Sequence, residues 1–274
     1  MSTERVGREA RLTAKDASGS PLFRALVSVG LVVVGCVHCL IGLLALQMAW
    51  LGEPDQEADQ KGALQAIAAN PAGGVLMWVV AIALIGLSLW KLTQAWWGYG
   101  YESERGKRAR KRLGAVGGAV MYLLLAVTAI RSSTGGSTQS GDSAQQTRVG
   151  ELLSQPFGQV LAVVAALIVV GYGAVLAKRG LSTSFTKELD AEPSEAVKRL
   201  GQAGYLSKAV AVALVGVMLG WAALTYDPQK AAGLDDSLHL VSRQTAGPIL
   251  LTVIAIGLIG YGIYCFSWSR HARR

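Results

Sequence analysis

Residues 70–88 read NPAGGVLMWVVAIALIGLS, residues 155–173 read QPFGQVLAVVAALIVVGYG, and residues 244–262 read QTAGPILLTVIAIGLIGYG. In each stretch an Asn or Gln is followed three residues later by a glycine, a long apolar run follows, and another glycine comes thirteen residues beyond the first. This self-similarity predicts one structural unit repeated three times, so the function has to be sought in that unit. Upstream, three further glycines align at spacings of 84 and 90 residues: Gly30, Gly114 and Gly204.

Each unit contains two long apolar runs that no Asp or Glu interrupts. A hydrocarbon core about 30 Å thick is crossed by about 20 helical residues, so each run is long enough to span a membrane. An apolar content of 51%, a charged content of 16% and a mean hydropathy of +0.38 agree. We therefore expect an all-α polytopic integral membrane protein with six transmembrane helices, arranged as three parallel two-helix repeats with pseudo-threefold symmetry. A soluble bundle is disfavoured, because soluble helices normally show a polar face.

The apolar runs and the charged segments between them predict the order of domains along the chain. We expect three repeats separated by cytoplasmic loops and flanked by basic cytoplasmic tails. No small-residue cleavage site follows the first run, which predicts an uncleaved anchor rather than a signal peptide. The expected parts are a tail at 1–23, repeat 1 at 24–98, a basic loop at 99–111, repeat 2 at 112–180, a loop at 181–197, repeat 3 at 198–269 and a tail at 270–274.

Basic residues are distributed unevenly between the two sides of the predicted membrane. If the amino terminus lies inside, the inner segments hold 21 of the 26 Lys and Arg residues. This asymmetry follows the positive-inside rule, so both termini are predicted to be cytoplasmic. We expect the inner face to contact anionic lipid head groups, and we expect no nucleic-acid partner, because the basic loop is too short to form a base-reading domain. The outer loops keep Lys61, Arg131, Arg148, Lys230 and Arg243.

A second pattern recurs in the outer loops. Leu64, Val149 and Leu238 take equivalent places, and each is followed three residues later by another apolar residue. This spacing predicts a short amphipathic helix at the membrane surface in each outer loop. Pro71 and Pro156 are predicted to start the membrane helix that follows, because a proline in the first turn loses no hydrogen bond.

Aromatic residues gather near the ends of the apolar runs. An amphipathic ring is favoured at the level of the lipid head groups, so these residues are predicted to be interface anchors. They include Trp90, Trp221, Tyr264 and Trp268.

Glycine is abundant, at 33 residues, and much of it lies inside the apolar runs. In lipid, small residues on one helix face allow the backbones of two helices to approach closely, so these glycines predict helix–helix packing. A ligand groove lined by glycine is the alternative. The predicted packing positions are Gly35, Gly42, Gly86, Gly114, Gly118, Gly171, Gly216, Gly220 and Gly260.

The first helix of each unit, together with the Gly-Tyr-Gly strings at 171–173 and 260–262, resembles the bacterial domain-of-unknown-function family 1206. That helix in the family carries a glycine, then a basic and a small residue, then a tyrosine and a further glycine. The basic place survives here only as Lys208 and the tyrosine only as Tyr122. The resemblance implies a bacterial inner-membrane protein, found mostly in actinobacteria, with no established activity. The aligned sets are Gly30, Val34, Gly35, His38 and Gly42, then Gly114, Gly118, Ala119, Tyr122 and Ala126, then Gly204, Lys208, Ala209, Val212 and Gly216.

Chemistry is best sought at Cys36, His38 and Cys39, because thiolate and imidazole are ligands for zinc or copper. On a helix the two cysteines share a face, whereas His38 points about 100° away from Cys39. No acidic residue or second histidine lies in the other apolar runs to complete a metal or haem site,. We therefore expect no metal, no cofactor and no catalytic residue. The polar positions expected in the membrane core are Cys36, His38, Cys39, Tyr122 and Lys208, and the side chain of Lys208 is expected to reach towards the inner face.

Three functions remain open at this point. The first is a non-enzymatic structural or accessory protein of the cell envelope that acts through lateral contacts and has no continuous polar cavity. The second is a transporter or channel-like protein for a small neutral or lipidic molecule, although parallel repeats lack the inverted symmetry that commonly underlies alternating access. It predicts a mid-membrane cavity lined by His38, Tyr122, Gln47 or Thr128. The third is a membrane enzyme for a lipid-linked substrate, which requires acidic outer-loop residues to converge over the bundle.

Overall fold

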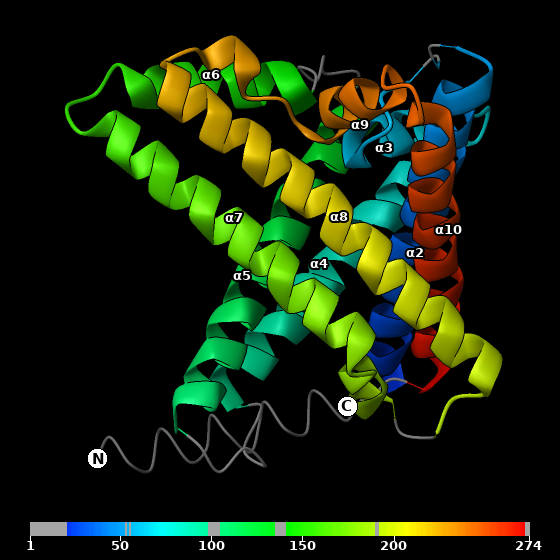
Figure 1. Ribbon diagram of the computed structural model, residues 1–274. Coiled ribbons are helices and arrows are strands. Elements are labelled where there is room, and N and C mark those ends of the chain that lie inside the picture. Colours follow the sequence, from blue (N-terminus) through cyan, green and yellow to red (C-terminus); the bar gives the residue numbers. More distant parts are fainter. Residues whose placement is uncertain are drawn as a thin grey trace.

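The chain folds into long helices that cross one another and short helices gathered at one end (Figure 1). The structure is a computed structural model and describes residues 21–52, 54, 56–97, 105–134, 141–189 and 192–271. Most of the predicted amino-terminal tail, residues 99–104 of the basic loop and residues 272–274 lie outside the described part. The helices are α2 (Pro21–Trp50), α3 (Gln60–Ala68), α4 (Gly73–Trp97), α5 (Arg105–Ser133), α6 (Gly141–Leu153), α7 (Gly158–Leu181), η1 (Ser184–Glu188), α8 (Glu195–Thr225), η2 (Pro228–Lys230), α9 (Leu234–Ser242) and α10 (Gly247–His271).

The six predicted membrane helices are confirmed as α2, α4, α5, α7, α8 and α10. Each has the length and the apolar composition needed to cross a membrane,. α2 begins at Pro21, inside the expected tail. Likewise, α5 starts at Arg105, inside the expected basic loop, and α8 starts at Glu195, inside the expected loop. The reason is that Arg, Lys, Glu and Ala favour helix, so these helices continue beyond the apolar runs into the charged segments.

The second membrane helix of each unit begins at an equivalent glycine. The N–H of Gly73 donates to the carbonyl oxygen of Asn70 at 2.7 Å, which closes a tight turn after α3. A β-carbon at Gly73 would lie only 2.0 Å from the carbonyl oxygen of Ala68, so the turn requires glycine. The same bond recurs from Gly158 to Gln155 and from Gly247 to Gln244.

The sequence predicted that Pro71 and Pro156 start the membrane helix. They lie instead within these turns, just before the helix. The bond from the glycine to the Asn or Gln fixes the turn around the proline, and regular helix begins two residues later.

The membrane helices pack mainly across the boundaries between units. The closest pairs are α4 with α5, α7 with α8, and α10 with α2, so the last unit returns to the first and closes a cycle. Within units, α2 contacts α4 and α8 contacts α10, whereas α5 and α7 of unit 2 make no comparably extensive contact. The α7–α8 pair is inclined to α2 and α10 (Figure 1). The bundle is therefore cyclic in its pairing but open between α5 and α7.

The three short helices form a layer over one end of the bundle. α3, α6 and α9 come from the three units, as the repeated pattern predicted, and lie at the same end (Figure 1). Leu64, Val149 and Leu238 are buried beneath them. A fully buried Leu or Val side chain contributes roughly 2 kcal/mol, so these positions fasten the layer to the bundle. Their common position agrees with three parallel repeats.

The contact between α2 and α10 is made by glycine. A β-carbon at Gly35 would lie 2.8 Å from the carbonyl oxygen of Gly262, and one at Gly262 would lie 2.6 Å from that of Gly35. Two turns further along, a β-carbon at Gly42 would lie 2.7 Å from the carbonyl oxygen of Ala255,. The two backbones touch over this length, as expected for helices that associate in lipid.

Other predicted packing glycines also meet a neighbouring helix. Gly216 faces Val170 and Gly86 faces Leu26. A β-carbon at either glycine would lie closer to that neighbour than an ordinary van der Waals contact. A β-carbon at three further positions would make an ordinary contact of 3.4 to 3.6 Å: Gly118, Gly220 and Gly260.

Gly114 and Gly171 are corrections to the prediction. A β-carbon at either position would meet no atom of the described residues within 4 Å, so neither glycine lies in a contact between described helices. The physical reason is that α5 and α7, the helices that carry them, make no extensive contact with each other.

Three aromatic residues predicted as interface anchors lie in the core instead. Trp90, Tyr264 and Trp268 are buried, with the rings of Trp90 and Trp268 6.0 Å apart. Phe185 of η1 packs against Tyr205 and Tyr264 with ring centroids at 5.0 and 5.1 Å. These rings form an internal aromatic column towards the end of the bundle opposite α3, α6 and α9.

The turn at Gly73 gives a test with an adjacent control. Gly73→Ala should destabilise the folded protein by about 1–3 kcal/mol, because the added methyl group meets the carbonyl oxygen of Ala68,. Gly74→Ala meets no atom within 4 Å and should be neutral or stabilising by about 1 kcal/mol,. Thermal unfolding in detergent would compare the two, and equal stability of both variants would contradict the requirement for glycine at the turn.

Candidate functional site

Three polar or aromatic side chains meet near the middle of the membrane. His38, Lys208 and Tyr261 each lie near the midpoint of their helices, which are α2, α8 and α10. The Nζ of Lys208 lies 3.2 Å from the Nε2 of His38 and 4.4 Å from the ring centroid of Tyr261. The rings of His38 and Tyr261 are 4.6 Å apart. We call these three residues the core cluster.

The direction of the hydrogen bonds in the core cluster follows from their partners. The Nδ1 of His38 lies 2.8 Å from the carbonyl oxygen of Val34, which can only accept, so Nδ1 carries the proton,. Nε2 is then an acceptor, and the ammonium of Lys208 donates to it. The π face of Tyr261 provides a second favourable surface for the cation,. None of the ion pairs formed by the described residues includes Lys208.

Glycine brings the three helices close enough for this contact. A β-carbon at Gly204 on α8 would lie 2.6 Å from the Cα of Tyr261 on α10. The contact between Gly35 and Gly262 does the same for α2 and α10. The core cluster is therefore located where three backbones converge.

The position of Lys208 differs from the expectation that it would reach towards the inner face. Its side chain is directed at His38 and Tyr261, because these groups supply a lone pair and a π face at mid-membrane. The remaining predicted polar positions are more scattered. Cys36 is exposed, the Sγ of Cys39 lies 3.9 Å from the carbonyl oxygen of Ile259, and Tyr122 packs against the main apolar core from α5.

The core cluster predicts an asymmetric response to mutation. His38→Ala leaves the Lys208 ammonium without its acceptor and should cost about 2 kcal/mol or more. Lys208→Met keeps an unbranched apolar stem of similar length and removes the charge, so it should be close to neutral. The double variant should be more stable than the sum of the single effects predicts, with a coupling of about 1–3 kcal/mol. Reversible unfolding in mixed micelles would measure this coupling, and additive effects would contradict a direct interaction.

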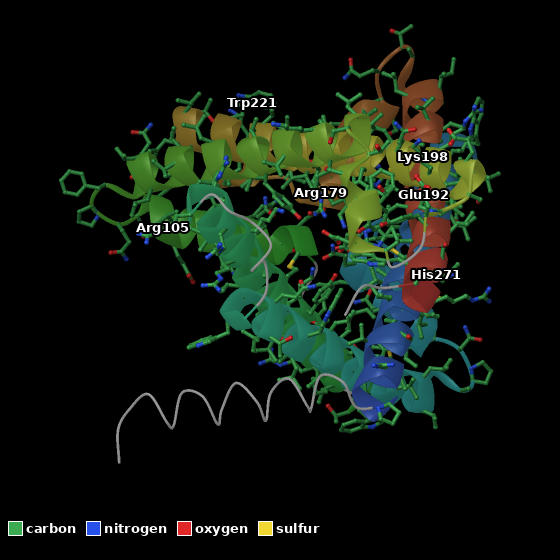
Figure 2. All side chains as sticks on the ribbon, turned by 90° about the horizontal axis from the view of Figure 1, so that it is seen from below. Arg105, Arg179, Glu192, Lys198, Trp221 and His271 are labelled. Carbon is green, nitrogen blue, oxygen red and sulfur yellow. The ribbon has the colours of Figure 1, made fainter. Side chains whose placement is uncertain are left out.

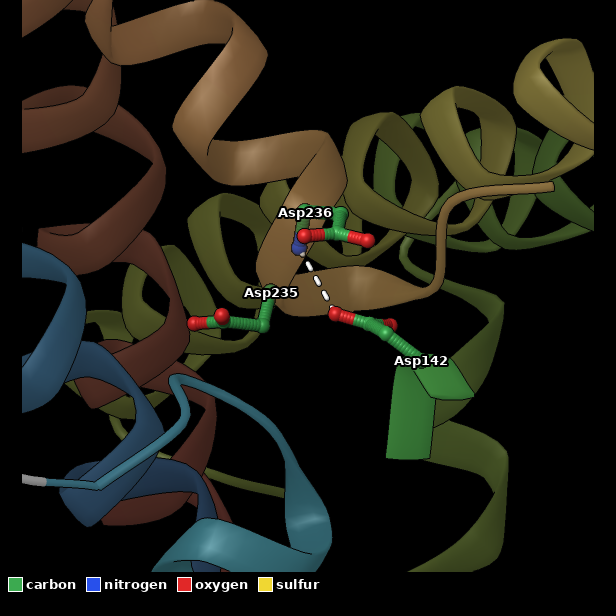
Figure 3. A group of neighbouring side chains, drawn as sticks. All are labelled: Asp142, Asp235 and Asp236. Atoms are coloured by element: carbon green, nitrogen blue, oxygen red, sulfur yellow. Dashed lines mark hydrogen bonds between the residues drawn. The ribbon is translucent and has the colours of Figure 1, made fainter. Parts of the chain in front are cut away.

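A second polar cluster lies outside the membrane, where α3, α6 and α9 begin. We call it the acidic layer and define it as Glu57, Asp59, Asp142, Asp235 and Asp236. Asp59, Asp142 and Asp235 are buried. Figure 3 shows the carboxylate of Asp142 on α6 directed at the backbone nitrogen of Asp236 at the start of α9, with a distance of 2.9 Å.

The acidic layer links the three units in a cycle. Glu57 of unit 1 accepts from the N–H of Gly141 in unit 2 at 3.1 Å. Asp142 of unit 2 accepts from the N–H of Asp236 in unit 3. Asp235 of unit 3 accepts from the N–H of Ala58 in unit 1 at 2.7 Å. Each unit thus supplies a carboxylate to the next unit. The donor is in the first turn of a helix or, for Ala58, just before the residue that caps α3, and a negative charge is favoured at a helix start,.

Comparison with known proteins identifies the repeated unit. The model for the Domain of Unknown Function (DUF1206) matches three segments, at residues 29–98, 113–182 and 203–272. The chain belongs to this family. It is also similar to an uncharacterised protein, YxxB, of Bacillus subtilis (strain 168), with 30% identity over 252 residues that cover 89% of each chain. No solved structure matches it.

Each family segment contains one pair of membrane helices and the short outer helix between them. Bacillus subtilis is not an actinobacterium, so the comparison gives no support to the expected actinobacterial origin. In the family unit His38, Tyr122 and Val212 take the same place, and only unit 1 has an imidazole there. The core cluster therefore depends on a residue that unit 1 has and the other two units lack, so the cluster is not repeated.

The carboxylates of the acidic layer are removed from water, and this burial disfavours their charged form. It raises the pKa of Asp142 to about 7 and that of Asp59 to about 6, although each accepts a hydrogen bond from a backbone N–H,. The pKa of Asp235 is raised for the same reason. The acidic layer therefore takes up protons near neutral pH.

The acidic layer fulfils the condition that a membrane enzyme would require, since acidic outer-loop residues do converge. One carboxylate oxygen from each of Asp142, Asp235 and Asp236 lies within 4.8 Å of the others, a spacing that also suits a metal ion. Two of these carboxylates, Asp142 and Asp235, already accept hydrogen bonds from backbone N–H groups, which leaves fewer lone pairs for a metal ion,. The contacts therefore favour a structural role between units.

The raised pKa values predict that stability depends on pH with a defined sign. Because folding raises the pKa of Asp142 and Asp59 above 3.8, the folded state binds protons more tightly than the unfolded state. The stabilisation is complete below about pH 4 and is lost as the pH rises through 6 to 7. Thermal unfolding in detergent should thus give a higher midpoint at pH 5 than at pH 8.

Asp142→Asn should reduce this pH dependence, because an amide keeps the acceptor oxygen without the charge. Glu151→Gln is the matched control, since Glu151 is an exposed acid on the same helix. An unchanged slope in Asp142→Asn would exclude Asp142 as the titrating group.

Proposed function

We propose that this chain is a non-enzymatic accessory protein of a bacterial plasma membrane, with both termini in the cytoplasm, that acts through lateral contacts within the membrane. The observation that carries the proposal is the core cluster. The polar groups at mid-membrane bind one another where the backbones of α2 and α8 approach that of α10, so these three helices are packed together at that level. A transport path would need these groups to face a continuous polar space.

The open side of the bundle supports the same proposal. α5 and α7 lack the contact that α2 makes with α4 and α8 makes with α10. Gly114 and Gly171 on these two helices have no neighbour within 4 Å of a β-carbon. Small residues on a lipid-facing helix surface allow another helix to approach closely, so unit 2 offers a surface for lateral contact.

A transporter is the second candidate, because Lys208 places a cation at mid-membrane without a carboxylate partner among the described residues. Intramembrane charges of this kind commonly belong to substrate or proton pathways. The two candidates differ in whether water reaches the core cluster.

Cysteine labelling tests both the closed centre and the orientation. In a background with Cys36, Cys39 and Cys265 replaced by Ala, His38→Cys should not react with a membrane-impermeant maleimide from either side. Ser154→Cys and Ser182→Cys are the exposed controls, expected to react only from the outside and only from the cytoplasm, respectively. Labelling of His38→Cys on intact membranes would favour transport, and the reverse pattern at the controls would overturn the assigned orientation.

A further inference from the structure

A cavity of about 580 Å³ lies beside the acidic layer at the outer end of the bundle. Its wall is formed by the end of α8, the η2 turn, α9 and part of the outer loop of unit 1. The volume lies in the range of about 300–1,000 Å³ that is usual for small-molecule sites. The lining residues that matter here are Met218, Trp221, Lys230, Asp235, Asp236 and Arg243.

The wall of the cavity changes from apolar to polar along the bundle. Met218 and Trp221 belong to the last turns of the membrane-spanning helix α8. Trp221 is 48% exposed and lies at the edge of the molecule in the view from below (Figure 2). The charged residues come from η2 and α9, which lie beyond the end of α8. An amphiphile with its acyl chains beside α8 and its head group in the cavity matches this order.

The polar wall carries charges of both signs. Arg243 is exposed and forms none of the ion pairs between described residues. Lys230 lies 3.5 Å from Asp227 and 5.3 Å from the ring centroid of Trp221. An ammonium and a guanidinium within one cavity are suited to a phosphate group.

The polar wall also has carboxylates that lack a strong cationic partner. Asp235 lies 3.7 Å from His239, and Asp236 accepts a hydrogen bond from the Nε2 of Gln146 at 3.3 Å. Burial raises the pKa of Asp235, so its charged form would gain from a cationic partner,. A ligand ammonium with several N–H donors would supply both charge and hydrogen bonds to these groups.

We propose that this cavity binds the phosphoethanolamine head group of a phospholipid in the adjoining bilayer leaflet, with the phosphate at Lys230 and Arg243 and the ammonium at Asp235 and Asp236. A phosphocholine head group is bulkier and has no N–H donor, and a phosphoglycerol head group has no cation. The site goes beyond the proposed lateral function, because it lies on units 1 and 3 and not between α5 and α7.

Native mass spectrometry of the full chain in detergent tests the proposal with three lipids that share palmitoyl and oleoyl chains. Phosphatidylethanolamine should bind more tightly than phosphatidylcholine or phosphatidylglycerol. Arg243→Gln should weaken its binding about tenfold, the effect of losing one charged hydrogen bond. Asp236→Asn should weaken phosphatidylethanolamine more than phosphatidylglycerol and so reduce the discrimination between them.

Matched controls separate this cavity from general binding of lipid to the surface. Arg148→Gln and Glu151→Gln change exposed charges on α6, outside the cavity lining, and should leave lipid binding unchanged. Thermal unfolding of each variant verifies its fold. If Asp236→Asn is unstable, Arg243→Gln carries the test, because the side chain of Arg243 is exposed.

Three results would overturn the proposal. They are equal affinity for the three lipids, unchanged affinity in both cavity variants, and displacement of the lipid by soluble phosphoethanolamine at an equal concentration. The last result would assign the cavity to a soluble ligand. None of these results bears on whether water reaches His38, so the lateral function and the lipid site fail independently.

Discussion

The close approach of α2 and α10 is the constraint on which the rest of the bundle depends. In hydrocarbon, helices gain little from burying apolar side chains against one another, so their association relies on close packing. Gly35 and Gly262 allow the two backbones to touch, and side-chain bonds join the ends of the pair, from Ser28 to the carbonyl of Ser269 and from Trp50 to Thr252. This contact unites the first helix with the last, and it places His38 beside Tyr261.

The fold was largely predictable, because the features that define it are local. Apolar length predicts the spans, and the spacing of residues such as Leu64 predicts the outer helices. The choice of neighbour was not predictable, because most membrane helices are apolar on every side. Gly114 and Gly35 look alike in the sequence, yet one faces open space and the other touches a backbone. Only the tertiary arrangement, in which α5 and α7 make no extensive contact, separates them.

The sites were harder to predict for the same reason. His38 and Lys208 were recognised as polar positions in the membrane core, but they are 170 residues apart and nothing local pairs them. Tyr261 was visible only as part of a Gly-Tyr-Gly string. The carboxylates of the acidic layer gave only a partial signal in the sequence: Glu57 and Asp142 take equivalent places seven residues before Leu64 and Val149, but the third unit has Ala231 there. Asp142 and Asp235 lie close together in space although they do not occupy equivalent places in units 2 and 3.

The cyclic bonds of the acidic layer have a consequence for biosynthesis. A chain is made from its amino terminus, and unit 1 enters the membrane before unit 3 exists. The N–H of Ala58 obtains its acceptor, Asp235, only after α9 has been synthesised, although the two residues belong to the first and last thirds of the chain. Unit 1 alone therefore has an unfinished outer surface. The assembly is completed by its final third, and a chain interrupted before that point lacks the bond that joins its end to its beginning.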